Sequence, residues 1–206
     1  MNVQLTDRPP FMDFDNIAEK KRLIFESTLE LVKEYGFHGT TMNTLAKTAN
    51  IAAGTIYHYF ESKDLLIMEL SLYVKRQMAM AIVDKLDKDT GYQDNFFRIW
   101  KNLFYYYCDN QTILLFWEQY LNSPYCKCKV SEVDDLFYKV YFGFFQEAQL
   151  GKAISDINYE VLAILVHAQI RMTAKIQLFG KTIIDETELE KIITLSWNGL
   201  KNNAVA

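Results

Sequence analysis

Two helical patterns of only about two turns each follow one another at residues 42–49 and 52–59. Asn50 stands between them and tolerates the left-handed conformation that a tight turn requires. A longer amphipathic pattern precedes them over residues 16–35, with one apolar face and charged residues between. Two short helices joined by a three- or four-residue turn and braced by a longer helix form a helix-turn-helix.

Residues with capping chemistry mark the ends of these patterns. Gly36 can close the first helix, because glycine adopts positive φ without strain. Thr40 and Thr41 offer an N-cap to the first short helix. Ser62 can cap the following helix, which we expect to start near Lys63 and to remain apolar as far as residue 86.

The rest of the chain also favours helices over strands. Glycine (eight residues) and proline (three) are scarce in 206 residues, whereas an all-β protein needs many turn residues. Half of the residues are hydrophobic, so a sizeable core can be buried. We therefore predict an all-α protein, with further helices over residues 95–108, 111–121, 130–150, 157–179 and 186–200.

The pattern predicts three parts. Residues 1–14 carry a Pro-Pro pair and no periodicity, which is typical of a flexible arm. Residues 15–64 form the predicted helix-turn-helix domain. Residues 65–206 form a larger helical domain.

Charge and hydropathy restrict the possible partners. The net charge is −4, and residues 1–64 hold seven Lys and Arg against nine Asp and Glu, so a DNA-binding role must rest on local geometry. No apolar run approaches the roughly 18 residues that span a bilayer, and the N-terminus lacks the pattern of a signal peptide. We expect a cytoplasmic protein without a membrane partner.

Neither metal nor enzyme chemistry has support in the sequence. Cys126 and Cys128 could form half of a metal site, but no set of Cys and His partners stands nearby, and Cys108 leaves an odd number for disulfides. Zinc-protease, phosphate-loop and nucleophile-elbow motifs do not occur. We predict no metal, no cofactor and no catalytic residue.

The second short helix begins with small residues. Gly54 costs an exposed helix interior about 1 kcal/mol relative to alanine. Small side chains over residues 52–55 would let the backbone and the positive helix end approach phosphates and base edges closely. Ile56 and Phe60, four residues apart, would anchor the helix to its neighbours.

The segment TTMNTLAKTANIAAGTIYHYFESKDLL, residues 40–66, resembles the N-terminal signature of the TetR (tetracycline-repressor-like) family of bacterial transcription regulators. In that family a helix-turn-helix passes through a glycine and a Tyr-x-aromatic-Phe run into a lysine-led helix. The resemblance implies a homodimeric repressor of a palindromic double-stranded DNA operator. Its larger C-terminal domain would bind a small-molecule effector and thereby change the spacing of the two DNA-reading heads.

The resemblance also implies which residues contact DNA. Thr40, Thr41 and Thr44 fall at the start of the first short helix, Thr55, Tyr57 and His58 on the recognition helix, and Lys63 on the next helix. Gly54 joins them through the close-approach argument. Alternatively, Tyr57, His58 and Tyr59 pack around a small three-helix core. The chain departs from the family at Ala52-Ala53, where a serine followed by lysine or proline is common.

The C-terminal part resembles the family in helical character and length. The last two predicted helices resemble the pair that builds a four-helix dimer interface, which predicts a homodimer through these helices; the alternative is that their apolar stripes form a core within one chain. Aromatic residues in excess of a small core, with a few polar groups among them, are what an apolar ligand pocket requires. The candidate ligand-binding residues are Trp100, Phe104, Tyr107, Trp117, Glu118, Tyr120, Phe137, Tyr141, Phe144, His167 and Arg171.

Two of these candidates have ordinary structural interpretations. Glu118 beside aromatic rings could hold a cationic ligand, or it could pair with a basic residue such as Arg171 or face water. His167 could be a hydrogen-bonded core histidine. An alternative for the whole chain is a helical module that carries a small molecule or lipid without regulating DNA. Competition between DNA and ligand would separate the two functions.

Overall fold

The described part of the chain is built from helices. The computed structural model describes residues 19–83, 85–87, 89–127 and 135–202. The predicted arm over residues 1–14, the first residues of the predicted helix 130–150 and Cys128 lie outside the described residues. Within these ranges the only extended pairing is an isolated bridge between Ile154 and Lys201. The all-α prediction is confirmed.

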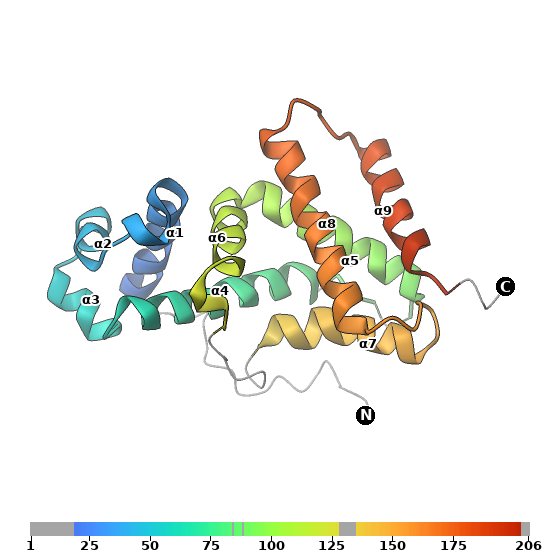
Figure 1. The fold of residues 1–206 in the computed structure, drawn as a ribbon, viewed down its shortest axis with the longest axis horizontal. Helices are drawn as coiled ribbons and strands as arrows, with labels where there is room; N and C mark the ends of the chain where they lie inside the picture. The colour runs from blue at the N-terminus through green and yellow to red at the C-terminus, as the bar shows by residue number, and fades with distance from the viewer. Residues whose placement is uncertain (1–18, 84, 88, 128–134, 203–206) are drawn as a thin grey trace. The chain divides into compact units, whose positions relative to one another are not determined.

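Figure 1 shows the helices in chain order. They are α1 (Glu19–Gly39), α2 (Met42–Thr48), α3 (Ala53–Tyr59), α4 (Lys63–Val83), α5 (Tyr92–Asp109), α6 (Gln111–Leu121), the 3₁₀ turn η2 (Pro124–Lys127), the π-helical turn η4 (Tyr138–Phe142), α7 (Gly143–Leu150), α8 (Tyr159–Phe179) and α9 (Glu186–Leu200).

The chain divides into two compact units. The N-terminal unit holds the described residues up to Leu70 together with residues 118–127, and the C-terminal unit holds residues 71–117 and 135–202. The predicted boundary at residues 64 and 65 thus falls inside α4, six residues before the division. Helices α4 and α6 each contribute residues to both units. Periodicity cannot reveal such a division, because it shows a helix but not which residues pack against which.

The N-terminal unit fixes its shortest helix through two apolar side chains. Ile56 and Phe60 are 0% and 1% exposed, as predicted for the anchors of α3. The ring of Phe60 packs on that of Phe25, with 5.6 Å between centroids. The Lys21 ammonium lies 5.4 Å from the Phe60 centroid and 2.5 Å from the Glu69 carboxylate. These contacts of Phe60 with Phe25 and Lys21, both on α1, keep α3 against α1.

The predicted caps and turn of the helix-turn-helix are confirmed. Thr41 Oγ1 accepts from the Thr44 amide at 3.1 Å, and Thr44 Oγ1 accepts from the Thr41 amide at 2.9 Å. This reciprocal pair is a capping box at the start of α2. Asn50 adopts a left-handed conformation, with φ of 51°. Ser62 Oγ accepts from the Leu65 amide at 3.2 Å and caps α4.

A kink at Gly36 shapes the end of α1. Its φ of 66° lies in the left-handed region, and the helical conformation then resumes as far as Gly39. The predicted helix end at Gly36 is therefore a kink three residues before the actual end. Thr40 Oγ1 donates to the Gly36 carbonyl at 2.8 Å, and Lys63 Nζ donates to the Phe37 carbonyl. Residues 36–40, the α1–α2 joint, are thus held by polar bonds.

The core of the C-terminal unit is rich in aromatic rings. Helix α5 buries one face, which contributes Phe96, Ile99, Trp100, Leu103, Phe104 and Tyr107. Helix α8 packs against α5 and α7. Residues 136–150 are helical as predicted, but they include the π turn η4, which the pattern did not predict. A π turn carries an extra residue, so it changes which side chains face inward.

Replacing Gly36 with alanine tests the kink. A side chain at positive φ costs about 1–2 kcal/mol, and an added Cβ would stand 3.3 Å from Gln119 Oε1. We expect Gly36→Ala to lower the free energy of unfolding in urea by at least about 1 kcal/mol. Gly143→Ala is the matched control, since nothing lies within 4 Å of its Cβ position. Equal stability of the two variants would contradict the assignment of strain to Gly36.

Candidate nucleic-acid interface and effector core

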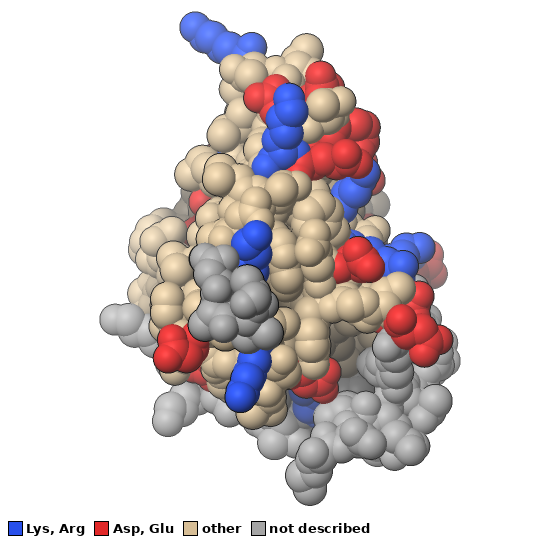
Figure 2. All heavy atoms as spheres, turned by 90° about the vertical axis from the view of Figure 1, so that its right-hand side faces the viewer, with Lys and Arg blue, Asp and Glu red and all other residues tan. Residues whose placement is uncertain are grey.

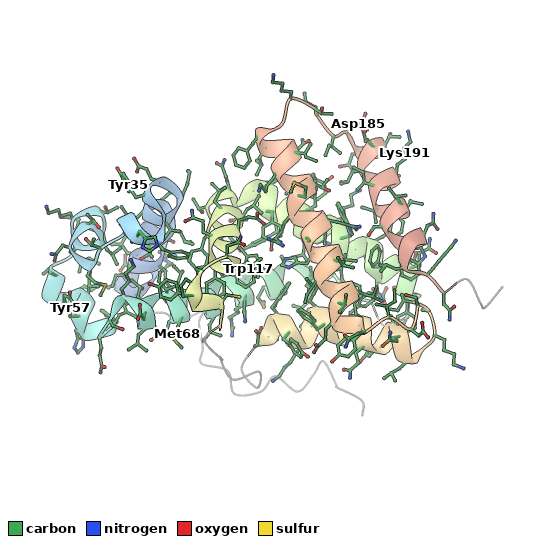
Figure 3. The ribbon with its side chains drawn as sticks, in the orientation of Figure 1. Tyr35, Tyr57, Met68, Trp117, Asp185 and Lys191 are labelled. Atoms are coloured by element: carbon green, nitrogen blue, oxygen red, sulfur yellow. The ribbon has the colours of Figure 1, made fainter. Side chains whose placement is uncertain are left out.

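Helix α3 presents a polar face to solvent opposite its buried anchors. Tyr57 is 50% exposed and His58 is also exposed, whereas the preceding residue, Ile56, is buried. Figure 3 shows Tyr57 on α3 in the N-terminal unit. His58 contacts the ring of Tyr59 edge-on, with 5.7 Å between centroids. Tyr57 and His58 therefore lie outside the three-helix core.

Gly54 stands in open space. An added Cβ would meet nothing within 4 Å, and the residue does not adopt positive φ. Neither packing nor backbone geometry within the described part of the chain requires glycine there. Since glycine lowers helix stability by about 1 kcal/mol relative to alanine, the residue is best explained by something that approaches α3 from outside.

The three predicted threonines of α2 have different surroundings. Thr41 and Thr44 are exposed, and their hydroxyl groups form the capping box. Thr40 is 2% exposed, and its hydroxyl is bonded to the Gly36 carbonyl. A buried hydroxyl group cannot reach DNA, so the structure gives Thr40 a structural role in the α1–α2 joint in place of the expected DNA contact.

The two lysines near the motif also differ. The Lys63 ammonium bonds the Phe37 carbonyl, and burial lowers the pKa of Lys63. Lys47 is exposed and forms no ion pair with any residue that the structure describes. It lines a shallow hollow of about 310 Å³ together with Ala46, Asn50, Ile51 and Ala52. Sequence reasoning missed Lys47, although a lone lysine in the last turn of α2 was a readable signal.

Four of the predicted ligand-binding residues surround a fifth, His167, in the C-terminal unit. The His167 ring centroid lies 5.3 Å from Phe137, 5.5 Å from Tyr141, 5.9 Å from Tyr107 and 6.5 Å from Trp117. These residues come from η4 and the residue before it, from α5, from α6 and from α8. We call them the aromatic cluster. Figure 3 shows Trp117 on α6.

Two members of the aromatic cluster, Tyr107 and His167, are hydrogen-bonded to each other. Tyr107 Oη lies 2.7 Å from His167 Nε2 and donates to Met78 Sδ on α4 at 2.8 Å. With this donation made, the Nε2–H tautomer of His167 donates to Tyr107. Burial, together with the charge of Arg171, lowers the pKa of His167 to about 3. His167 is therefore neutral at physiological pH, and Met78 is a member that sequence reasoning missed.

Of the remaining predicted ligand-binding residues, Arg171 is near enough for its charge to lower the pKa of His167, and the others lie elsewhere. Trp100 stacks on Phe104 along α5, and Phe144 contacts Tyr92. Glu118 and Tyr120 belong to the N-terminal unit, where Tyr120 Oη donates to the Tyr125 carbonyl at 3.5 Å. The structure thus brings together about half of the predicted set. The helical pattern could not show that α6 changes units after Trp117.

Helix α8 carries apolar residues on two faces, of which one is buried and the other is exposed. Its inner face is buried and includes Leu162, Val166 and Ile170. Its outer face exposes a stripe of large apolar residues, which are Val161, Ile164, Leu165, Met172, Ile176 and Phe179. Figure 2 shows the side of the molecule on which α9 lies in Figure 1, and most of its surface is uncharged.

The described residues contain neither a metal-binding group nor a membrane-spanning helix. No group of three or more His, Cys, Asp or Glu among the described residues could hold a metal ion. No helix in the described ranges has the length and apolar character of a membrane span.

Fold and site together define a class of protein: a helix-turn-helix unit with an exposed recognition helix, joined to a larger helical unit with an aromatic core. Residues 24–70 match the family described as "Bacterial regulatory proteins, tetR family", and residues 91–201 match "Tetracyclin repressor-like, C-terminal domain". The chain belongs to the TetR family of transcriptional regulators and is a DNA-binding protein.

Relatives match over nearly the whole chain. An uncharacterized HTH-type transcriptional regulator from Haemophilus influenzae is 29% identical over 180 residues, which cover 86% of this chain and 94% of that protein. A crystal structure of a TetR-family regulator from Haemophilus influenzae is 26% identical, with a TM-score of 0.73 and coverage of 89% and 97%. A TetR-family structure from Marinobacter aquaeolei has a TM-score of 0.81 at 18% identity, covers 89% and 96%, and shows the shared fold.

The neutral buried His167 predicts a dependence of stability on pH. Its pKa in the folded state is about 3, below the value of about 6.5 in an unfolded chain. Between these values the unfolded state binds the extra proton, so stability falls as the pH is lowered below about 6.5, by up to about 1.4 kcal/mol per unit from this group. Urea unfolding of wild type and His167→Gln at pH 7.5 and pH 5 measures the difference.

From pH 7.5 to pH 5, we expect the free energy of unfolding of His167→Gln to fall by about 1–2 kcal/mol less than that of wild type. Glutamine can still bond Tyr107 but does not titrate. His38→Gln is the control, because His38 is exposed. A fall in stability of the same size in wild type and His167→Gln would show that His167 is not the buried neutral group.

Proposed function

We propose that the chain is a homodimeric repressor, released from a palindromic operator when a small, largely apolar or aromatic molecule binds the C-terminal unit. The observation that carries the DNA part is Gly54, an exposed glycine that the fold itself does not require. A recognition helix enters the major groove with its N-terminal residues, where a large side chain would hold it away from the bases.

The DNA contacts follow from the exposed groups of α2 and α3. Thr55 is placed one residue beyond Gly54 and would contact a base edge or a thymine methyl group. Tyr57, His58 and Lys47 would contact phosphates. Thr41 and Thr44 would do so by donating their hydroxyl hydrogens, in exchange for the bonds that these hydroxyl groups make with each other and with the Thr41 carbonyl. Lys63 holds the α1–α2 joint in the free chain, and a phosphate contact would require that bond to be exchanged.

The proposed effector site is the aromatic cluster. Its rings surround a neutral histidine, and hydrogen bonds hold Tyr107 to His167 and Met78. Apolar walls with a few convergent polar groups are what small-molecule sites in proteins have. The cationic ligand considered for Glu118 loses support, because Glu118 belongs to the N-terminal unit and Arg171 places positive charge near His167.

The proposed dimer uses the outer face of α8 together with α9. Leu165 is 55% exposed on α8 and Leu195 is 74% exposed on α9. An apolar stripe of this length on one helix is unusual for a surface that faces only water. A second copy of the chain would cover it, and a two-fold arrangement would present two recognition helices to half-sites about one helical turn, roughly 34 Å, apart.

Effector binding would act by population shift. A ligand that prefers one conformation of the C-terminal unit stabilises it at the expense of the others. Release follows if the two recognition helices of that conformation no longer match the half-site spacing. A gel shift against the DNA upstream of the chain's own gene tests the function. Failure to retard a palindromic fragment specifically at low salt would contradict it.

Gly54→Leu tests the close approach of α3. Leucine has a higher helix propensity than glycine and enters open space, so helix content should be unchanged and stability should not fall. Specific DNA affinity should fall by at least about 100-fold, since the leucine side chain would hold α3 away from the major groove and several of its side chains would lose their contacts. Gly54→Ala is the graded control, with a smaller loss. If Gly54→Leu binds DNA as tightly as wild type does, the proposed close approach of α3 to DNA is contradicted.

Ile164→Glu tests the dimer. A carboxylate buried against a second copy's apolar stripe loses hydration without a partner, so dimerisation should weaken by more than about tenfold. Sedimentation measures the dimer, and a gel shift should show a parallel loss of operator affinity. Met80→Glu is the matched control, because Met80 is 43% exposed on α4, away from this stripe. An Ile164→Glu variant that dimerises like wild type would place the interface elsewhere.

A further inference from the structure

Side chains from two distant helices bond the carbonyl groups at the α1–α2 joint and just before it. Gln119 Nε2 of α6 donates to the Val32 carbonyl at 2.9 Å, and Lys63 Nζ of α4 donates to the Phe37 carbonyl. The last turn of a helix leaves carbonyl groups for outside donors. The ring of Phe37 also packs edge-on against Tyr125, with 5.3 Å between centroids. The joint therefore depends on residues far away in the sequence.

The two donor helices are also the two that contribute residues to both units. Helix α4 is divided after Leu70, and helix α6 is divided after Trp117. Trp117 lies in the aromatic cluster, whereas Gln119, two residues later, belongs to the N-terminal unit. A continuous helix thus connects the proposed effector site to the bond that holds α1.

The position of Gln119 is tightly determined. Its Oε1 lies 3.3 Å from where a Cβ on residue 36 would stand, so the glycine leaves room for the amide group. Its Nε2 bonds Val32, one helical turn before Gly36. The amide group therefore bonds α1 before the kink and lies close to the kink itself, so a displacement of α6 at this residue would change the bond directly.

The joint in turn places the first helix of the DNA-reading motif. The Thr40 hydroxyl and amide both donate to the Gly36 carbonyl, at 2.8 and 3.2 Å. The next residue, Thr41, is the N-cap of α2. Helix α2 packs against α3. A change in the backbone at Gly36 is therefore passed to the start of α2 and from there to the recognition helix.

We propose that Gln119 is the positioning residue through which α6 passes the state of the aromatic cluster to the α1–α2 joint. This inference rests on the proposed function, because it takes the aromatic cluster as the effector site. With the Gln119 bond to Val32 in place, α2 and α3 have the orientation that binds the operator. When α6 shifts, the bond breaks, and the joint loosens.

The first test measures the joint in the protein without DNA. Gln119→Ala removes the bond to Val32, and amides of residues 36–45 should exchange their hydrogens about fivefold faster or more. Asn122→Ala is the matched control, because Asn122 directly follows α6 and its side-chain amide donates to the Glu118 carbonyl in the last turn of that helix. Unchanged exchange over residues 36–45 in Gln119→Ala overturns the inference, whatever the protein's affinity for DNA.

The second test measures coupling through operator affinity. Trp117→Phe disturbs the aromatic cluster, and side chains two residues apart on a helix do not face each other. We expect Trp117→Phe to change operator affinity about fivefold in wild type and less than about twofold in the Gln119→Ala background. No effect of Trp117→Phe, or an equal effect in both backgrounds, contradicts the route through Gln119.

The same gel shift with the wild-type chain distinguishes a failure of the proposed function from a failure of the inference about Gln119. Wild type that fails to bind a palindromic operator contradicts the proposed function. Wild type that binds, together with additive Trp117 and Gln119 variants, leaves the proposed function standing and overturns only the role of Gln119.

Discussion

The helix-turn-helix depends on tertiary contacts that stabilise α3, because this helix is too short to be stable alone. Helix α3 has seven residues, far fewer than the roughly 12–15 that an isolated helix needs in water. Its first turn lacks a side-chain cap at Ala52 and contains Gly54. Burial of Ile56 and Phe60 therefore has to supply its stability, and the Phe60 ring is in turn held by Phe25 and Lys21. Because the anchors take the inner face, the small residues and Tyr57 remain free for DNA.

The same reasoning explains why polar bonds to carbonyl groups hold the kinked end of α1 within the N-terminal unit. A kinked helix end needs donors from outside, and in this chain the donors stand on α4 and α6. Those helices also carry Met78 and Trp117 in the core of the C-terminal unit. Hydrogen bonds are directional, so a shift of either helix alters the geometry at the joint more sharply than apolar packing would. This directionality is the physical basis of the proposed coupling between the core of the C-terminal unit and the DNA-reading motif.

Local chemistry made most of the N-terminal unit predictable. Capping by Thr41, the left-handed Asn50 and the anchors Ile56 and Phe60 each follow from one residue type at one position. Tertiary contacts were not predictable in the same way. Thr40 is buried because the chain turns back at Gly36, and Lys63 bonds a carbonyl group 26 residues earlier. In the C-terminal unit, helical spacing identified the aromatic residues, but η4 and the division of α6 decided which of them meet at His167.

The mass of the complex with operator DNA tests the central claim most directly, because it depends on both the recognition helix and the exposed stripe of α8. Sedimentation of the full chain with a duplex that holds one palindrome should give two chains per duplex, with no complex of one chain at low protein concentration. A duplex in which one half-site is scrambled should bind far more weakly. One chain per duplex, or equal binding to the palindrome and the scrambled duplex, would contradict the account of a dimer that reads two half-sites.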